Sequence, residues 1–295
     1  MKDFLDCMEI FYKRRILWKI PLFLSEMRVF FYTLLKQVTF LRHSAIIMKG
    51  IRNKIHTNKT YTSKTKQKNT VQKGDNKMEL KGIKMACLGD SIPEGVGVTD
   101  LSNMYYNRIQ RECGIRELYI DGIGGTRIAR QKNPSEKPRH DLYFIPRVDD
   151  IDEDCDLVVV FGGTNDFGHG DAPIGTPEDR TEDTFWGACH VICEKLITRF
   201  PKSQIVFMGP LHRLNEDSPC GDKKPAPVGT LYDYVDILKT VTRKYSIPFL
   251  DMLQVGGMTP KVPIYQELYM PDGLHPNDDG HARIAARLKG FLLSL

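Results

Sequence analysis

Ser91 lies in a Gly-Asp-Ser segment at 89–91, directly after the apolar run 83–88. A serine at the tip of a strand can act as a nucleophile when a neighbouring base takes its proton. Pro93 suits the first turn of a helix, so the same serine can also be an ordinary helix cap. Backbone N–H groups at a helix start attract anions as well. The segment alone therefore leaves a nucleophile, a helix cap and a phosphate-binding loop open.

A candidate base lies near the C-terminus, where Asp272 precedes His275 by three residues. Within one loop, such a carboxylate can accept from one ring nitrogen, which leaves the other nitrogen to face a serine hydroxyl. His281 with Asp278 or Asp279 is a rival pair. Its residues share one helix, where this spacing is typical of an ordinary surface contact. We therefore prefer Asp272 and His275.

Two further segments could stabilise a negatively charged oxygen. Gly-Ile-Gly-Gly at 122–125 permits a tight turn and a close backbone approach, but it lacks the Gly-x-Gly-x-x-Gly spacing of dinucleotide sites. Asn165, in Gly-Thr-Asn-Asp at 163–166, has an amide that can donate to a developing oxyanion. The same asparagine can instead form a local turn. His169 follows closely enough to line the site, either as a substrate contact or as part of the loop.

The elements that must position these residues follow a regular pattern. Apolar runs expected to be strands lie at 83–88, 117–121, 156–161, 204–208 and 247–250. Their spacing leaves room for one crossover helix between successive strands. The run 157–161 is apolar throughout, as expected of a strand covered on both faces. The pattern predicts a three-layer α/β/α sandwich with a central five-stranded parallel sheet, of the flavodoxin-like type.

Helical patterns occupy the intervals between these runs. The pattern at 182–200 places an apolar stripe from Phe185 to Ile197 behind the acidic pair at 182–183. Further patterns cover 231–245 and the region from about Pro276 to Leu295. Ligands of open parallel sheets bind at the carboxyl ends of the strands. We therefore expect the polar segments to meet at that edge.

Residues 1–77 differ from the rest of the chain in charge. They hold 17 Lys/Arg against five Asp/Glu, whereas the remainder holds 25 against 32. A membrane span needs about 18 nearly charge-free residues, which this leader lacks, and Lys19 and Pro21 interrupt what could otherwise be a cleavable signal. Three interpretations stay open: a basic helix on an anionic membrane, a partner-binding extension, or sequence upstream of a start at Met78.

The third interpretation is favoured, because 49–77 is a polar tract with little to bury. We expect residues 1–77 to be disordered or outside the native domain, and 78–295 to form the compact domain. Seven cysteines form an odd set without Cys-x-x-Cys pairs, which favours a cytoplasmic, disulfide-free protein. No spacing typical of metal ligands occurs, so neither a metal nor a cofactor is expected.

Taken together, the four polar segments resemble the SGNH hydrolase family, also called the GDSL-like lipases and esterases. The resemblance covers residues 80–295. It implies that Ser91 is the nucleophile, that His275 is the general base and then the acid, and that Asp272 orients the histidine. It also implies an oxyanion hole formed by the backbone N–H groups of Ser91 and Gly125 and by the side chain of Asn165.

The resemblance implies a serine esterase that transfers an acyl group to water. Asp90 and His169 are the candidates for substrate contact. The long segments 133–146 and 212–229 are expected to form walls or a lid. Neither is strongly apolar, which favours a short-acyl or acetyl ester of a polar substrate, such as an acetylated sugar.

Three alternatives stay open beside this esterase. The first is a lipase, lysophospholipase or thioesterase of the same fold, and the second is a non-catalytic phosphate-binding module. In the third, the basic leader is the functional part and tethers the domain to an anionic membrane or nucleic acid. The partner expected for the domain is a small ester, with no nucleic acid.

Overall fold

In a computed structural model, the protein is described over residues 78–295, and the expectations for the basic leader fall outside the described residues. The described part contains one parallel sheet of five strands, in the order β2-β1-β3-β4-β5. The strands are β1 (Lys84–Gly89), β2 (Glu117–Gly122), β3 (Leu157–Phe161), β4 (Gln204–Met208) and β5 (Phe249–Leu250). This sheet confirms the predicted α/β fold.

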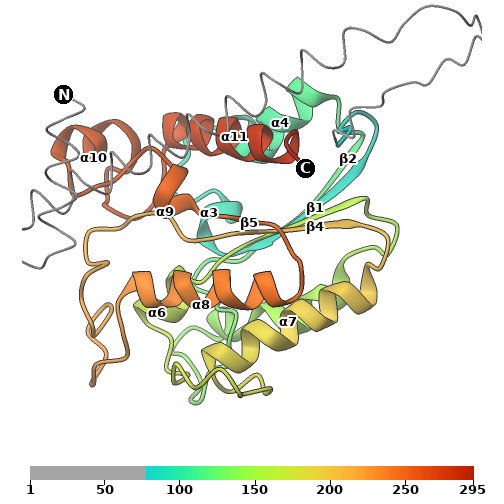
Figure 1. Ribbon diagram of the computed structural model, residues 1–295. Helices are drawn as coiled ribbons and strands as arrows, with labels where there is room; N and C mark the ends of the chain where they lie inside the picture. Colours follow the sequence, from blue (N-terminus) through green and yellow to red (C-terminus); the bar gives the residue numbers. More distant parts are fainter. Residues whose placement is uncertain (1–77) are drawn as a thin grey trace, which may run out of the picture. The chain divides into compact units, whose positions relative to one another are not determined.

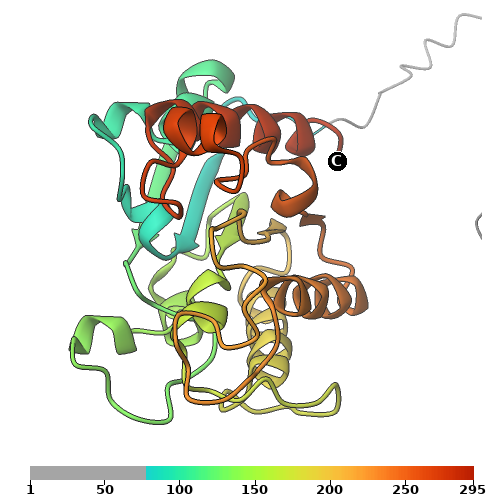
Figure 2. The same cartoon turned by 90° about the vertical axis from the view of Figure 1, so that its left-hand side faces the viewer.

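Helices cover both faces of the sheet (Figure 1). On one side lie α3 (Ser91–Glu94), α4 (Tyr105–Cys113), α9 (Met252–Val255), α10 (Pro263–Tyr269) and α11 (Asp278–Leu292). On the other lie α5 (Phe144–Arg147), α6 (Thr164–Gly168), α7 (Phe185–Arg199) and α8 (Leu231–Lys244). Short 3-10 turns occur at η3 (Leu101–Asn103), η4 (Pro138–Asp141) and η5 (Val148–Asp150). Figure 2 shows the C-terminal helices separated by the sheet from the yellow and orange helices.

Strand β1 shows why both faces are covered. Its residues Ala86 and Leu88 pack in the cluster that includes α7 and α8, whereas Met85 and Cys87 pack in the cluster that includes α4 and α11. Successive side chains of a strand point to opposite faces. A strand that lies between two helical layers must therefore be apolar at every position, as β1 and β3 are nearly throughout.

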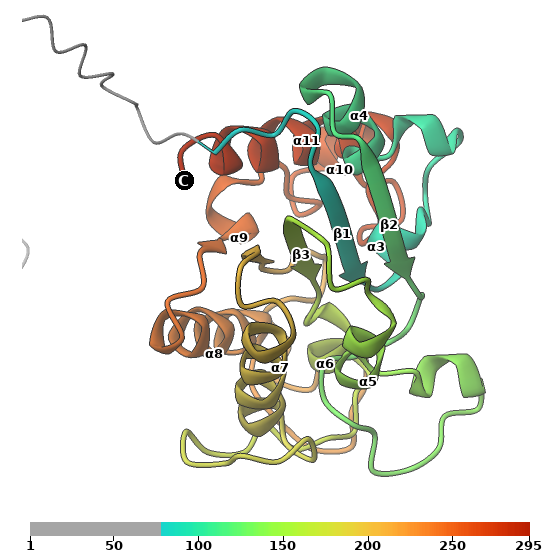
Figure 3. The same ribbon diagram turned by 90° about the vertical axis from the view of Figure 1, so that its right-hand side faces the viewer.

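The strands beside β1 end level with it. Gly89 pairs with Gly122 of β2 and with Phe161 of β3, and Figure 3 shows β1 and β2 with their arrowheads side by side. Because β1 lies between β2 and β3, the strand order reverses at β1, where open sheets bind ligands. The register thus brings the segments after β1, β2 and β3 to one edge.

Strand β5 is shorter than the predicted run 247–250. The Ile247 N–H donates to the Thr242 carbonyl at 3.0 Å, at the end of α8. Pro248 has no N–H to donate. Phe249 and Leu250 pair with β4, and the Pro248 carbonyl accepts from the Phe207 N–H at 3.0 Å. The Ile247 N–H therefore bonds to the end of helix α8, and Ile247 does not join the strand that the local pattern predicted.

Helix α7 begins later than residue 182. Thr184 is its N-cap, and the Thr184 hydroxyl accepts from the Gly187 N–H at 3.1 Å. The acidic pair 182–183 therefore precedes the helix instead of forming its first turn. Ile197, which was predicted to lie on the buried stripe, is 37% exposed. No helix within residues 78–295 has the length and apolar character that crossing a membrane requires.

Candidate active site

Ser91, His275 and Asp272 form a continuous chain of hydrogen bonds. The Ser91 Oγ lies 3.0 Å from His275 Nε2, and His275 Nδ1 lies 2.6 Å from Asp272 Oδ2. Ser91 is the first residue of α3, directly after β1, and it is 7% exposed. The structure therefore brings together three residues that the sequence places at opposite ends of the domain.

The carboxylate of Asp272 holds both the ring and the backbone of the histidine. Besides the ring, Asp272 accepts from the N–H groups of Leu274 at 2.9 Å and His275 at 2.7 Å. Partial burial opposes ionisation, but these hydrogen bonds outweigh it and lower the pKa of Asp272. An ionised Asp272 accepts the Nδ1–H of His275. The Nε2 atom is then free to accept from the Ser91 hydroxyl.

Asp90 explains how the serine can begin a helix. It is the N-cap of α3, and its Oδ1 accepts from the Ile92 N–H at 3.1 Å. Asp90 is 1% exposed, and burial raises its pKa to about 7. This placement disfavours the predicted substrate contact of Asp90, because a substrate reaches only accessible atoms. The cap belongs to Asp90, so Ser91 starts the helix with its hydroxyl left for His275.

The turn after β2 lies against Ser91. A methyl group added to Gly124 would lie 3.5 Å from Ser91 Cβ. The Gly124 N–H donates to Glu94 Oε2 at 2.7 Å, so it is already occupied. The Gly125 N–H has no acceptor within residues 78–295, and this glycine adopts a left-handed φ of 79°. Of the two glycines, Gly125 is therefore the one with a backbone donor left for a substrate.

Asn165 lies in the first turn of α6 and is 6% exposed. Its Nδ2 donates to the Thr126 carbonyl at 2.9 Å, and its Oδ1 lies 3.1 Å from His169 Nε2. An amide nitrogen carries two hydrogens, so one is left after the Thr126 contact. The Thr126 contact also ties α6 to the turn that carries Gly125. Two of the predicted oxyanion residues, Asn165 and Gly125, are therefore linked through a single hydrogen bond to the residue after Gly125.

Arg147 is a residue of the site that the sequence did not indicate. Its buried guanidinium pairs with Asp121 at 2.8 Å and donates to the Gly89 carbonyl at 3.0 Å and to Thr126 Oγ1 at 3.1 Å. It thereby joins the ends of β1 and β2 to the glycine turn. Nothing local in the sequence around Arg147 reveals this role, because its partners come from distant segments.

Both long connecting segments lie beside the site. His140, from 133–146, covers the glycine turn, since a methyl group added to Gly125 would lie 2.5 Å from His140 Cδ2. Leu214, from 212–229, donates its N–H to the Gly273 carbonyl at 3.1 Å in the loop of Asp272 and His275. One segment therefore lies beside Gly125, and the other lies beside the loop that carries Asp272 and His275.

His281 is placed differently from the expected surface contact. Its ring is 0% exposed, and its Nδ1 accepts from the Tyr105 N–H at 3.3 Å. Burial lowers the pKa of His281 to about 4. The ring also stacks on Tyr105, with the ring centroids 5.9 Å apart. His281 is therefore a neutral core residue of α11, and the rival pair does not form a site.

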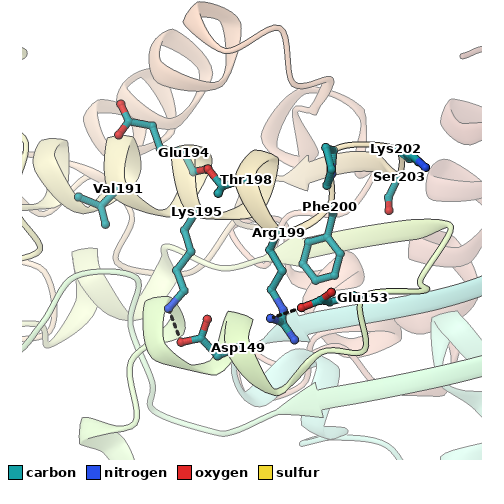
Figure 4. A pocket seen from close by; sticks show the side chains of 11 residues that line it. Asp149, Glu153, Val191, Glu194, Lys195, Thr198, Arg199, Phe200, Lys202 and Ser203 are labelled. Carbon is teal, nitrogen blue, oxygen red and sulfur yellow. Dashed lines mark hydrogen bonds and ion pairs between the residues drawn. The ribbon is translucent and has the colours of Figure 1, made fainter.

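A separate surface hollow of about 780 Å³ lies along α7 (Figure 4). It contains none of the predicted site residues. Four of its charged groups form two ion pairs, Lys195 with Asp149 at 2.6 Å and Arg199 with Glu153 at 3.2 Å. Within residues 78–295, no group of three or more side chains could hold a metal ion.

The fold and the site together define a three-layer α/β/α protein whose Ser-His-Asp chain stands at the switch point of the sheet. The model of the GDSL-like lipase/acylhydrolase family matches residues 87–283. The chain therefore belongs to the GDSL-like lipase/acylhydrolase family.

Solved structures show the same fold. One is 29% identical with a TM-score of 0.63, covering 74% of this chain and 99% of its own. A protein from Lactobacillus plantarum is 29% identical with a TM-score of 0.62, covering 72% and 98% respectively. A proposed GDSL-like lipase from Bacteroides uniformis is 18% identical with a TM-score of 0.52, covering 72% and 97%. A search of the curated proteins gives no match.

Proposed function

We propose that the protein is a serine esterase that cleaves a short-acyl or acetyl ester of a polar substrate, such as an acetylated sugar. The hydrogen-bond chain from Asp272 through His275 to Ser91 carries this proposal. Ser91 and His275 are 184 residues apart in sequence, so no local turn preference accounts for their contact. Family membership supports ester hydrolysis as the class of reaction.

In the first half of the reaction, His275 Nε2 takes the Ser91 proton while Ser91 Oγ attacks the ester carbonyl carbon. The imidazolium is stabilised by the Asp272 carboxylate. It then gives its proton to the alcohol oxygen as the carbon–oxygen bond breaks. In the second half, His275 takes a proton from water, which attacks the acyl-enzyme, and the proton returns to Ser91 Oγ as the acid leaves.

The carbonyl oxygen becomes negative in both halves of this reaction. The donors proposed for it are the N–H groups of Ser91 and Gly125 and the second Nδ2 hydrogen of Asn165. Such donors are held in place before the charge develops, and loss of one typically costs about 10²- to 10³-fold in kcat. The Thr126 contact of Asn165 supports this role, because it limits the rotation of the amide.

The walls of the site support a polar alcohol part and a small acyl part. His140 covers Gly125, and Arg139 pairs with Glu94 on the same side. Leu214, at the opposite wall, is 49% exposed. A long acyl chain needs a continuous apolar lining, whereas a single apolar side chain is enough for a short one. These features favour the esterase over a lipase of the same fold.

The catalytic assignment is tested with p-nitrophenyl acetate. We expect Ser91→Ala and His275→Ala each to lower kcat by at least about 10³-fold, since removal of a triad member leaves only the residual catalysis of the site. A fluorophosphonate probe should label the wild type and fail to label Ser91→Ala. Ser294→Ala, at an exposed serine near the end of α11, is the control. Normal hydrolysis by either site variant refutes the assignment.

The substrate class is tested with a panel of p-nitrophenyl esters of increasing chain length and of acetylated sugars. We expect kcat/KM to be highest for acetyl esters and to fall as the acyl chain lengthens. A maximum at long chains would contradict the short-acyl proposal and favour a lipase, lysophospholipase or thioesterase. Phosphate binding without any labelling of Ser91 would favour the non-catalytic module.

A further inference from the structure

An oxyanion-hole asparagine must present its nitrogen to the substrate. The two ends of an amide have nearly the same shape, but only the nitrogen end donates. An amide that turns by half a rotation would present its oxygen to the negatively charged carbonyl oxygen. The contacts of both ends of Asn165 therefore decide whether this donor is available.

We infer that His169 and Arg127 are positioning residues that fix the Asn165 amide with its nitrogen toward the substrate. This inference rests on the proposed function. Arg127 follows Thr126 after the glycine turn, and its Nη2 is 2.8 Å from His169 Nδ1. A guanidinium only donates, so His169 Nδ1 must accept. The other ring nitrogen of a neutral His169 then carries the hydrogen.

The direction of the remaining hydrogen bonds follows from that tautomer. His169 Nε2 donates to Asn165 Oδ1 at 3.1 Å, and Asn165 Nδ2 donates to the Thr126 carbonyl at 2.9 Å. The direction of each hydrogen bond is therefore fixed. The Arg127 guanidinium at one end can only donate, and the Thr126 carbonyl at the other end can only accept. The turned amide would place Oδ1 against a carbonyl and Nδ2 against an N–H, so both contacts would become repulsive.

Arg127 is itself held firmly, which a fixed starting point requires. Its side chain is 3% exposed, and its Nη1 donates to the His140 carbonyl at 2.9 Å. Asp141 Oδ1 lies 3.7 Å from the same nitrogen, and Ser135 Oγ lies 3.3 Å from it. These partners all belong to the segment 133–146. The segment therefore has a second function besides forming a wall, because it anchors the guanidinium that orients His169.

The sequence predicts either a substrate contact or a role within the loop for His169. Both of its ring nitrogens are occupied by protein groups, Arg127 and Asn165. No nitrogen is therefore left for a polar substrate atom, although His169 is an exposed residue. Desolvation and the neighbouring Arg127 cation lower the pKa of His169 to about 4. The ring is therefore neutral at the near-neutral pH of an esterase assay.

The test compares two substitutions of His169 in the full chain. His169→Leu removes both hydrogen bonds. His169→Gln keeps a donor that can reach Asn165 Oδ1 and an acceptor for Arg127. We expect His169→Leu to lower kcat on p-nitrophenyl acetate by about tenfold or more, toward the loss expected for Asn165→Ala, with little change in KM. We expect His169→Gln to recover most of that loss.

A double-mutant comparison separates positioning from other roles. If His169 acts through Asn165, adding His169→Leu to Asn165→Ala should lower kcat by less than about twofold, because the group it orients is already absent. A full additional loss, a rise in KM as the main effect, or an unchanged kcat in His169→Leu would each overturn the inference. Fluorophosphonate labelling of Ser91 in every variant shows whether the esterase assignment holds, independently of this outcome.

Discussion

Replacement of Arg147 by methionine should destabilise the protein more than loss of any ordinary surface ion pair. The Arg147 and Asp121 side chains are 6% and 14% exposed. Arg147 also donates to the backbone carbonyls of Gly89 at 3.0 Å and Asp121 at 2.6 Å. Removing one partner of a buried ion pair typically costs about 3 to 5 kcal/mol, because the other charge is left without a partner.

For a domain of this size, about 1 kcal/mol corresponds to roughly 2 to 4 °C in Tm. Arg147→Met should therefore lower Tm by roughly 6 to 20 °C in a thermal melt, with a matching decrease in the free energy of unfolding in urea. Arg147→Met combined with Asp121→Asn should recover part of the loss, since the second change removes the buried negative charge.

Arg130→Met is the matched control for this experiment. Arg130 pairs with Asp183 at 2.6 Å, but these side chains are 51% and 59% exposed. An exposed pair contributes about 0 to 1 kcal/mol, because water and salt screen it. The reasoning is refuted if Arg147→Met costs less than about 1 kcal/mol, or if Arg130→Met costs as much as Arg147→Met.

Two further substitutions test the site. Asp90 has a folded-state pKa of about 7, above its unfolded value of about 4. The wild type should therefore lose stability relative to Asp90→Asn as the pH rises from about 4 to 7. This is contradicted if the difference in Tm between the two proteins is the same at pH 4.5 and at pH 8. Gly125→Ala places a methyl group against the His140 ring at a φ of 79° and should lower kcat by at least about tenfold. The control Gly290→Ala, where the added methyl group meets open space, should leave kcat unchanged. Equal effects of the two substitutions on kcat would argue against the oxyanion role of Gly125.

Much of the fold could be predicted from local pattern. The run 157–161 is apolar at every position, as a strand between two covering layers must be, and it forms β3. The candidate site residues could be predicted for a related reason. Ser91 and Asn165 follow strands, and the carboxyl ends of neighbouring parallel strands lie at one edge of a sheet. The chemistry of these residues stays a prediction until it is measured.

Element ends were predicted less well, because they depend on caps. Helix α7 begins where the Thr184 hydroxyl accepts from the Gly187 N–H. The acidic pair 182–183 resembles the first turn of a helix, so the sequence predicted a start two residues before this cap. Ile247 is not part of β5, because its N–H donates to the Thr242 carbonyl in the last turn of α8. In both places a hydrogen bond to one particular group decided the boundary, whereas the apolar pattern records only which side chains are buried.

The sequence by itself determined the order of the strands along the chain, their burial on both faces, and the residue types that meet at one edge. Only the tertiary structure decided which atoms are available there. Glu94 takes the Gly124 N–H and leaves that of Gly125. Arg147 reaches a carbonyl 58 residues away and Arg127 a histidine 42 residues away. Contacts at such separations follow from how the layers pack, which local spacing does not encode.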